Sequence, residues 1–231
     1  QQQKNLPEIA ESRIRLLHAL APGEIRAALQ PFGYYQPRID GTLDYRDESW
    51  IATYHIDLGT PVRIVELDVH IEGDASSDPE FRQRLADLPI RQGDILVHAR
   101  YEQAKHALQN LGAQRGYFDA ALVRNDVRVD LADNSARISL HYASGARYRF
   151  GAVTFQQVDG LELPLLQRYV PFKQGDPYDS NKILKLQTAL GDSEYFQQVD
   201  VEPRRDQAEN LAVPVDIKLT LRERDKYTLG G

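Results

Sequence analysis

The chain of 231 residues contains no cysteine and no methionine. The lack of cysteine excludes disulfide bonds and thiolate metal sites, and it leaves the redox compartment of the protein open. The chain also does not begin with methionine, and its opening residues, QQQKNLPEIA, have neither the basic stretch nor the apolar stretch of a secretory signal. We therefore expect a processed or excised piece of a longer product.

Long apolar runs and a basic surplus are missing as well. No stretch approaches the roughly 20 continuous apolar residues of a membrane-spanning helix. The formal net charge is −6, whereas proteins that bind the phosphate backbone of nucleic acid carry clustered positive charge. The composition, 42% hydrophobic and 27% charged, is that of a chain that buries real cores. We expect soluble domains and no nucleic-acid partner.

A nearly identical heptad occurs twice, as LPIRQGD at residues 88–94 and as VPFKQGD at residues 170–176. A strand-like run precedes each copy, and a helical pattern and an aromatic entry into another strand follow it. The entries read GYF at residues 116–118 and EYF at residues 194–196. An internal period of about 80 residues that mixes strand and helix indicates a tandem array of small, similar domains.

The two complete repeats predict the order strand, short helix, long helix, strand, strand. Apolar residues at helical spacing mark each long helix, and Gly112 and Gly191 follow its last leucine, where a helix end belongs. The final strand of the last repeat, residues 211–221, alternates apolar and polar side chains. We expect this strand at the centre of a three-stranded mixed sheet, with the first and second strands at the edges. The predicted fold class is α+β.

The first strand of each complete repeat changes its apolar phase midway, near Val65 in one repeat and Gly151 in the other. This change predicts a β-bulge at both places. The QGD sequences are interpreted as turns leading into the long helices, with Asp94 and Asp176 beginning or preceding those helices. Asp179 or the residue after it is the expected N-cap of the last long helix.

The N-terminal residues hold an incomplete further copy. We predict two helices, residues 13–20 and 24–32, then an aromatic entry GYY and two strands, with no strand before the helices. The aromatic entries of all copies would pin a helix to its sheet, with stacking on a ligand as the alternative. The expected domains are residues 1–60, without a first strand, residues 61–145 and residues 146–225, followed by a continuation at residues 226–231.

Residue types that carry catalysis or bind metals are scattered along the chain. His98, Glu102 and His106 share one helix face in a spacing that suits metal ligands, but the last repeat has serine, leucine and threonine at the corresponding positions. We therefore interpret the three residues as a solvated helix flank. The chain has no nucleophile elbow and no phosphate-binding glycine loop. We expect no enzymatic activity, no cofactor and no metal.

The order of elements, the QGD loop before the long helix, the leucine–glycine helix ending and the GYF entry resemble POTRA (polypeptide-transport-associated) domains of the outer-membrane protein assembly superfamily. The resemblance covers essentially the whole chain. Three units that end in LRERDKYTLGG look most like those of the translocation and assembly module. The resemblance implies a tandem array of three small POTRA-like domains, each with two helices on one face of its sheet. Residues 226–231 would approach a C-terminal outer-membrane β-barrel.

The resemblance also implies a function. It indicates a non-enzymatic module in the periplasm of a Gram-negative bacterium, the soluble part of an outer-membrane protein that works in protein assembly or autotransporter translocation. The implied partners are unfolded outer-membrane proteins and an inner-membrane-anchored TamB-like protein. The alternative is a substrate-recognition region of a two-partner secretion pore.

An exposed sheet edge is the expected means of binding. An extended polypeptide adds to such an edge through backbone hydrogen bonds, a mode called β-augmentation that tolerates many sequences. The second strand of the middle repeat is the candidate, because charges interrupt its apolar pattern and discourage uncontrolled pairing. A protected edge without a partner is the alternative. The candidate partner-binding residues are Tyr117, Phe118, Ala120, Leu122, Arg124, Asp126 and Arg128.

Overall fold

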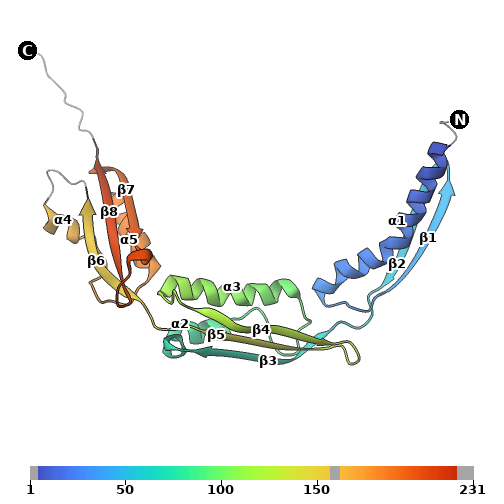
Figure 1. The fold of residues 1–231 in the computed structure, drawn as a ribbon, viewed down its shortest axis with the longest axis horizontal. Helices are drawn as coiled ribbons and strands as arrows, with labels where there is room; N and C mark the ends of the chain where they lie inside the picture. Colours follow the sequence, from blue (N-terminus) through green and yellow to red (C-terminus); the bar gives the residue numbers. More distant parts are fainter. Residues whose placement is uncertain (1–4, 157–161, 223–231) are drawn as a thin grey trace, which may run out of the picture. The chain divides into compact units, whose positions relative to one another are not determined.

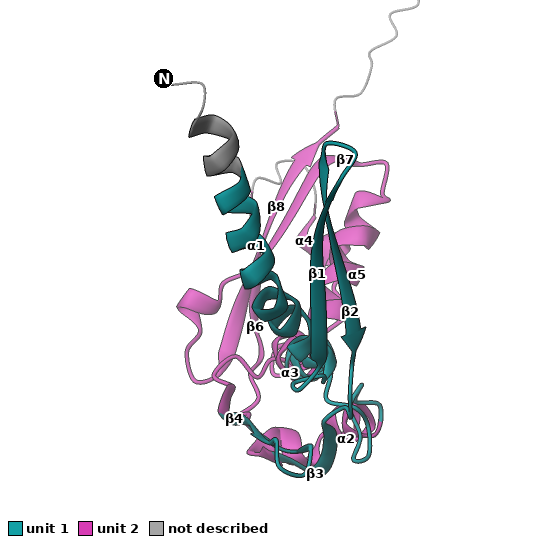
Figure 2. Cartoon of the chain, turned by 90° about the vertical axis from the view of Figure 1, so that its right-hand side faces the viewer, with its two compact units in different colours: residues 1–70, 87–106, 124–141 teal, residues 71–86, 107–123, 142–231 magenta. Residues whose placement is uncertain are grey.

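The computed structural model describes residues 5–156 and 162–222, which form three successive repeats of helices and strands (Figure 1). The chain divides into two compact units, and the middle repeat contributes segments to both (Figure 2). No helix within the described residues is long and apolar enough to cross a membrane. The predicted continuation at residues 226–231 lies outside the described residues, and the predicted domain boundaries remain predictions.

The first repeat consists of one helix and a β-hairpin. Its elements are α1 (Asn5–Leu29), a 3-10 turn (Gln30–Phe32), β1 (Arg38–Arg46) and β2 (Ser49–Asp57). The two strands pair antiparallel along their whole length. Asp47 and Glu48 form the two-residue loop between them, and both have positive φ angles, 50° and 60°. Such a loop twists with the strands and closes a tight hairpin.

The prediction of two helices in this repeat was wrong, because α1 runs through Pro22 without ending. Proline has no N–H, so the carbonyl oxygen of His18, four residues earlier, loses its helical donor. The Tyr54 hydroxyl on β2 lies 3.4 Å from this carbonyl oxygen and donates to it. The neighbouring strand therefore supplies a donor to the carbonyl oxygen that lacks one because of Pro22. The helix continues with a change of direction that is visible in Figure 1.

The middle and third repeats confirm the predicted order of elements. In both, the last strand lies between the first and the second, in the orders β3-β5-β4 and β6-β8-β7. The middle repeat contains β3 (Arg63–Glu72), a 3-10 turn (Asp74–Ser77), α2 (Pro79–Ala86), α3 (His98–Arg115), β4 (Ala121–Asp130) and β5 (Ser135–Ala143). The third contains β6 (Arg149–Gln156), α4 (Leu163–Gln167), α5 (Ser180–Gly191), β7 (Phe196–Pro203), a 3-10 turn (Arg205–Gln207) and β8 (Ala212–Leu221).

The sheet of the third repeat is mixed, because β6 pairs with β8 in parallel and β7 pairs with it antiparallel. The bulge predicted at Gly151 is confirmed by a register shift between Phe150 and Val153. The N-cap predicted at Asp179 is also confirmed, since its side chain accepts a hydrogen bond from the Asn181 amide at 2.9 Å. The predicted α+β fold class is therefore confirmed. The helix end predicted at Gly112 is wrong, because α3 continues through this glycine to Arg115.

Burial differs sharply between the repeats. The alternate residues Val213, Val215, Ile217 and Leu219 of β8 are completely buried. In the first repeat, Ile56 of β2 is 41% exposed. Within the described residues, β2 has no neighbouring strand on the side away from β1. The core of the third repeat comprises Phe150, Leu166, Phe172, Tyr178, Ile183, Leu186, Leu190, Phe196, Val201, Val213, Val215, Ile217 and Leu219.

Candidate protein-binding edges

The repeated QGD loop lies along the outer edge of the first strand. In the middle repeat, the Gly93 amide donates to the Ile64 carbonyl oxygen at 2.7 Å, and the Ile64 amide donates to the Asp94 carbonyl oxygen at 2.9 Å. The Leu96 amide donates to the Val62 carbonyl oxygen at 2.9 Å. The loop thus forms a short antiparallel ladder with the first residues of β3 and closes that part of the edge.

The third repeat uses the same three hydrogen bonds. The Gly175 amide donates to the Phe150 carbonyl oxygen at 2.8 Å, and the Phe150 amide donates to the Asp176 carbonyl oxygen at 2.9 Å. The Tyr178 amide donates to the Tyr148 carbonyl oxygen at 3.0 Å. The heptad therefore recurs because each copy builds the same edge-covering segment.

The aspartates of this loop cap a turn and not a helix. The Asp94 carboxylate accepts from the Arg91 amide at 3.0 Å, and the Asp176 carboxylate accepts from the Lys173 amide at 3.0 Å. The Lys173 amide is also the main reason why the pKa of Asp176 is lowered. The helices α3 and α5 begin only later. The prediction that these residues begin or precede the helices holds for their place in the chain, but not for a helix-capping role.

The second strands are at the opposite edge. β4 is the outer strand of the middle sheet, and it contains four of the predicted partner-binding residues, namely Leu122, Arg124, Asp126 and Arg128. Arg124 Nε lies 2.7 Å from Asp126 Oδ1, and Arg128 Nε lies 3.2 Å from Asp126 Oδ2. The bond from Arg124 contributes most to the lowered pKa of Asp126. The charges of this strand are therefore paired with one another.

One backbone acceptor of β4 is already in use. The Tyr101 hydroxyl on α3 donates to the carbonyl oxygen of Asn125 at 2.6 Å. The remaining predicted residues, Tyr117, Phe118 and Ala120, precede the strand, which begins at Ala121. Their place outside β4 limits a backbone ladder to residues 121–130.

Tyr117 belongs to a buried polar cluster around Asp78. Its hydroxyl donates to Asp78 Oδ2 at 3.0 Å, and Arg115 Nε lies 2.7 Å from the same oxygen. The Asp78 side chain is only 2% exposed. Burial alone would raise the pKa of Asp78, but the hydrogen bonds from Arg115, from the Glu80 amide and from Tyr117 together lower it. Burial, and then the bond to Asp78, raises the pKa of Tyr117 to about 12.

Sequence patterns did not indicate Asp78, because a lone aspartate before a proline is an ordinary start of a helix. Its significance depends on Arg115 and Arg147, two residues from distant segments that only the fold brings next to it. The buried aromatic ring lies one position later in EYF (residues 194–196) than in GYF (residues 116–118). Tyr117 is buried in the middle repeat, whereas in the third repeat Phe196 is buried and Tyr195 is 53% exposed. The Tyr117 ring packs against Phe81 of α2 with 5.5 Å between centroids, and Phe196 belongs to the core that α5 shares with the sheet, which agrees with the pinning interpretation.

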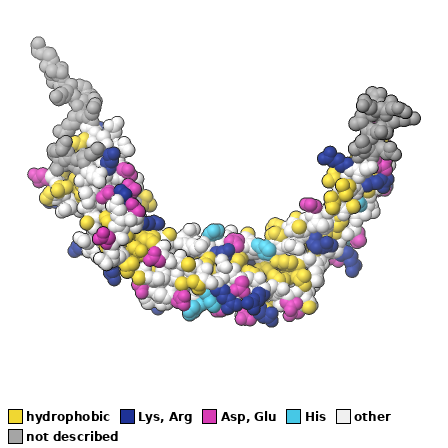
Figure 3. All heavy atoms as spheres, viewed as in Figure 1, with side chains coloured by type: hydrophobic (Ala, Val, Ile, Leu, Met, Phe, Trp, Pro, Cys, Tyr) yellow, Lys and Arg dark blue, Asp and Glu magenta, His cyan; other side chains and the backbone are white. Residues whose placement is uncertain are grey.

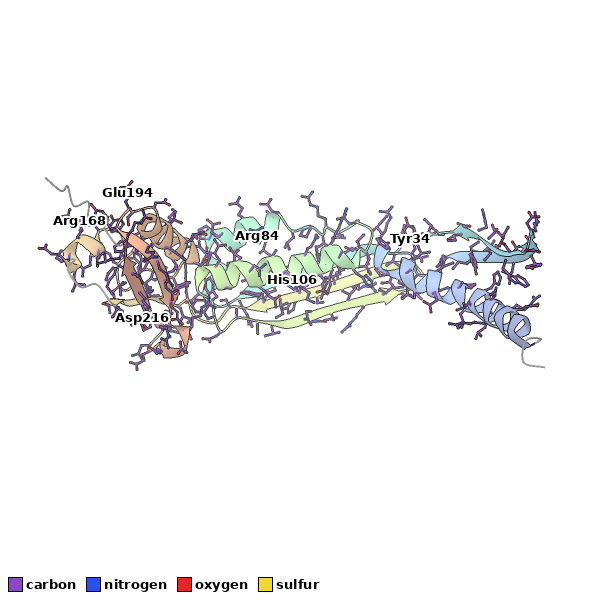
Figure 4. All side chains as sticks on the ribbon, turned by 90° about the horizontal axis from the view of Figure 1, so that it is seen from above. Tyr34, Arg84, His106, Arg168, Glu194 and Asp216 are labelled. Atoms are coloured by element: carbon purple, nitrogen blue, oxygen red, sulfur yellow. The ribbon has the colours of Figure 1, made fainter. Side chains whose placement is uncertain are left out.

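The helix face considered for a metal has other contacts. The Tyr35 hydroxyl and His98 Nε2 lie 2.6 Å apart, and Glu102 accepts from Lys105 Nζ at 2.9 Å. His106 lies further along α3 (Figure 4). Within residues 5–156 and 162–222 no three such side chains form a group suited to a metal ion. On the face seen in Figure 3, several basic side chains lie side by side along the lower edge, next to acidic and histidine side chains.

Comparison with known protein families agrees with the repeat architecture. The family model described as a surface antigen variable number repeat, the POTRA model, matches residues 67–143 and 148–224. The chain belongs to the POTRA family. A second family model, described as POTRA domain TamA domain 1, matches residues 2–58, so all three repeats are POTRA-like.

Several solved structures are similar to this chain at low sequence identity. BamA from Haemophilus ducreyi lacking POTRA domains 1–3 is 16% identical with a TM-score of 0.53, and the match covers 69% of this chain and 29% of that chain. POTRA3-5 of Haemophilus influenzae BamA is 18% identical with a TM-score of 0.49, covering 82% and 74%. CdiB from Acinetobacter baumannii is 13% identical with a TM-score of 0.40, covering 95% and 39%.

Proposed function

We propose that this POTRA chain is the periplasmic, non-enzymatic module of an outer-membrane protein assembly or translocation factor, and that it binds extended polypeptides by strand addition at β4. The observation that carries the proposal is the division of edges in the middle sheet. The QGD loop pairs with the start of β3, whereas β4 is the outer strand on the opposite side.

The charges on β4 suit a regulated edge. Arg124, Asp126 and Arg128 alternate along the strand and pair with one another. A neutral apolar edge would pair with further copies of the chain, and charged side chains disfavour such pairing. Backbone hydrogen bonds to an incoming strand do not depend on its side chains. The edge can therefore accept many different clients, as a handler of unfolded outer-membrane proteins requires.

The match of the first repeat to the first POTRA domain of TamA supports a place in the translocation and assembly module. Under this proposal the second partner is a TamB-like protein anchored in the inner membrane. The same match favours this assignment over a two-partner secretion pore. Neither partner requires a cofactor, because backbone pairing supplies the binding energy.

A backbone-amide NMR titration tests the proposal. The chain is titrated with an extended peptide that has the alternating pattern of a barrel strand, and separately with a soluble segment of the TamB-like protein. We expect shifts concentrated in residues 121–130, and little change in residues 62–64, whose backbone groups pair with the QGD loop. Shifts confined to other edges would refute the role of β4.

Two adjacent proline variants sharpen this test. In an antiparallel edge strand, successive N–H groups point alternately toward the neighbour and toward solvent. Of Val123→Pro and Arg124→Pro, one therefore removes a ladder bond to β5 and lowers stability, and the other removes an outward amide. We expect the better-folded variant of the two to lose peptide binding. Retention of full binding in that variant would exclude strand addition at this part of β4.

A further inference from the structure

The residue that directly precedes the first strand makes the same two backbone hydrogen bonds in the middle and third repeats. The connection between two successive repeats is called a joint. At the joint before the third repeat, the Tyr148 amide donates to the Gly116 carbonyl oxygen at 2.8 Å, and the Tyr178 amide donates to the Tyr148 carbonyl oxygen at 3.0 Å. At the joint before the middle repeat, the Val62 amide donates to the Gly33 carbonyl oxygen at 2.8 Å, and the Leu96 amide donates to the Val62 carbonyl oxygen at 2.9 Å. The two joints therefore share one backbone design.

The glycines of GYY and GYF are required by this design. Gly33 and Gly116 have φ angles of 91° and 84°, which a side chain disfavours. A Cβ atom on Gly33 would lie 2.6 Å from Ile95 Cγ2, and one on Gly116 would lie 2.6 Å from Tyr178 Cβ. The first residue of the aromatic entry thus allows the following repeat to approach the end of the preceding helix.

The joint before the third repeat has an additional element, the side chain of Arg147. Its Nε donates to the Arg115 carbonyl oxygen at 2.9 Å, and its Nη2 donates to the Tyr178 carbonyl oxygen at 3.1 Å. Its Nη1 lies 3.6 Å from the carboxylate of Asp78. One linker guanidinium therefore contacts the end of α3, the acid before α2 and the segment before α5.

Neighbouring groups hold this guanidinium in place. The Arg147 amide donates to Asp74 Oδ2 at 3.0 Å, and its guanidinium lies over the Tyr117 ring at 5.6 Å. Beside it, the Phe118 ring packs against Tyr178 with 4.9 Å between centroids, and the Arg205 guanidinium lies 4.1 Å from the Phe118 ring centroid. Aromatic and cation–π contacts of this kind stabilise a fixed orientation.

The joint before the middle repeat lacks these groups. Pro61 precedes Val62 where Arg147 precedes Tyr148, and Phe32 precedes Gly33 where Arg115 precedes Gly116. The side-chain hydrogen bonds of the first joint that the structure shows are exposed. They join Tyr35 to His98 at 2.6 Å and Gln36 to the Leu131 carbonyl oxygen at 3.3 Å. Exposed contacts of this kind constrain orientation weakly, because water competes for the same groups.

We propose that Arg147 is a latch that fixes the third repeat against the helical segments of the middle repeat through Asp78, Arg115 and Tyr178. Among the described residues, the joint before the middle repeat has no corresponding latch. A guanidinium suits this task because its planar array of N–H donors serves several acceptors at once, whereas a lysine ammonium is a single point charge on a flexible stem. This latch is independent of where a client binds.

The absence of cysteine makes the proposal directly testable with paired spin labels. One pair, Gln109→Cys and Lys185→Cys, spans the joint before the third repeat from exposed helix positions. We expect Arg147→Ala to broaden the distance distribution of this pair by about twofold, and Arg147→Lys to broaden it partly. A second pair, Ala27→Cys and Gln103→Cys, spans the other joint and should not respond.

Arg137→Ala is the matched control, because Arg137 is 53% exposed and its ion pair with Glu66 is long, at 3.5 Å. Far-ultraviolet circular dichroism establishes which variants are folded. If Arg147→Ala does not fold, Arg147→Lys decides the outcome. An unchanged distribution in the folded Arg147 variant would overturn the latch. Equal broadening by Arg137→Ala would also overturn it, since the effect would then not depend on the three contacts.

Discussion

Gly151 of β6 lies directly against Pro214 of β8. A Cβ atom at position 151 would be 2.9 Å from the Pro214 nitrogen. Pro214 sits in the central strand of the sheet, where a proline normally leaves a ladder acceptor without a donor. The Pro214 carbonyl oxygen accepts from the Arg204 amide at 2.8 Å, so the missing N–H would face the end of β7. On the other side, the register shift between Phe150 and Val153 places the bulge of β6 beside this proline. The glycine leaves room for the close approach of the β8 backbone at this place.

Gly151→Ala should therefore destabilise the third repeat. The added methyl group meets backbone atoms that cannot move independently, so we expect a loss of about 1–3 kcal/mol in the free energy of unfolding. Urea denaturation measures it. Gly191→Ala in the same repeat is the control, because a Cβ there meets nothing within 4 Å. Equal stability of the two variants would contradict the proposed contact.

Tyr54→Phe tests how α1 passes through Pro22. The variant removes the hydroxyl that donates to the His18 carbonyl oxygen, and we expect a loss of about 0.5–1.5 kcal/mol in the stability of the first repeat. Tyr45→Phe is the matched change on β1, where the side chain is 60% exposed, and it should have little effect. Trp50 is the single tryptophan, so its fluorescence reports the unfolding of this repeat.

The same fluorescence should show that the first repeat unfolds before the others. A two-stranded sheet is marginally stable alone, and the fully buried large side chains, such as Phe150, Leu140 and Ile217, lie in the later repeats. We expect the Trp50 transition at a lower urea concentration than the loss of the far-ultraviolet signal of the whole chain. Coincident transitions would mean that the repeats unfold as one cooperative unit.

Two glycine variants separate backbone strain from steric conflict. Gly93 has a φ of 94°, and the space that its Cβ atom would occupy is open, so Gly93→Ala should cost about 1–2 kcal/mol through strain alone. Gly116 has a φ of 84° and a Cβ atom there would also collide with Tyr178. We expect Gly116→Ala to lose more stability in urea denaturation. A smaller loss for Gly116→Ala would argue against close packing at this joint.

Asp78 should make stability depend on pH in the acid range. Its pKa is lowered in the folded chain, so the ionised carboxylate stabilises the fold above its unfolded pKa, and this contribution is lost as the pH falls through the lowered folded value. The charges that face it are Arg115 and Arg147. Asp78→Asn should lower the free energy of unfolding by about 1–3 kcal/mol at neutral pH.

Urea midpoints measured from neutral to acid pH check this expectation. The difference between the parent chain and Asp78→Asn should shrink as the carboxylate becomes protonated. Asp126→Asn is the control, because Asp126 also has a lowered pKa but lies on the exposed edge strand, where ion pairs contribute little. An unchanged difference across the acid range would mean that the Asp78 charge does not stabilise the fold.

Local patterns determined the elements of the complete repeats. Alternation along residues 211–221 predicted a central strand, the phase change at Gly151 predicted a bulge, and Asp179 was identified as a helix cap. These features depend on side chains within a few positions of one another, which is the range over which periodicity and capping act. The internal repetition then doubled the evidence, because two copies of one pattern rarely arise by chance.

Tertiary structure alone decided how the segments meet. The continuation of α1 through Pro22 depends on Tyr54 from a distant strand, and the edge-covering role of the QGD loop depends on Ile64 and Phe150, which precede it. The Asp78 cluster joins residues from a turn, a helix end and a linker. Backbone pairing and buried charge require partners that are close in space but remote in the chain. The sequence by itself determined three repeats and the order of their elements. Which edges the QGD loops cover, and which distant residues meet at Asp78, followed from the packing.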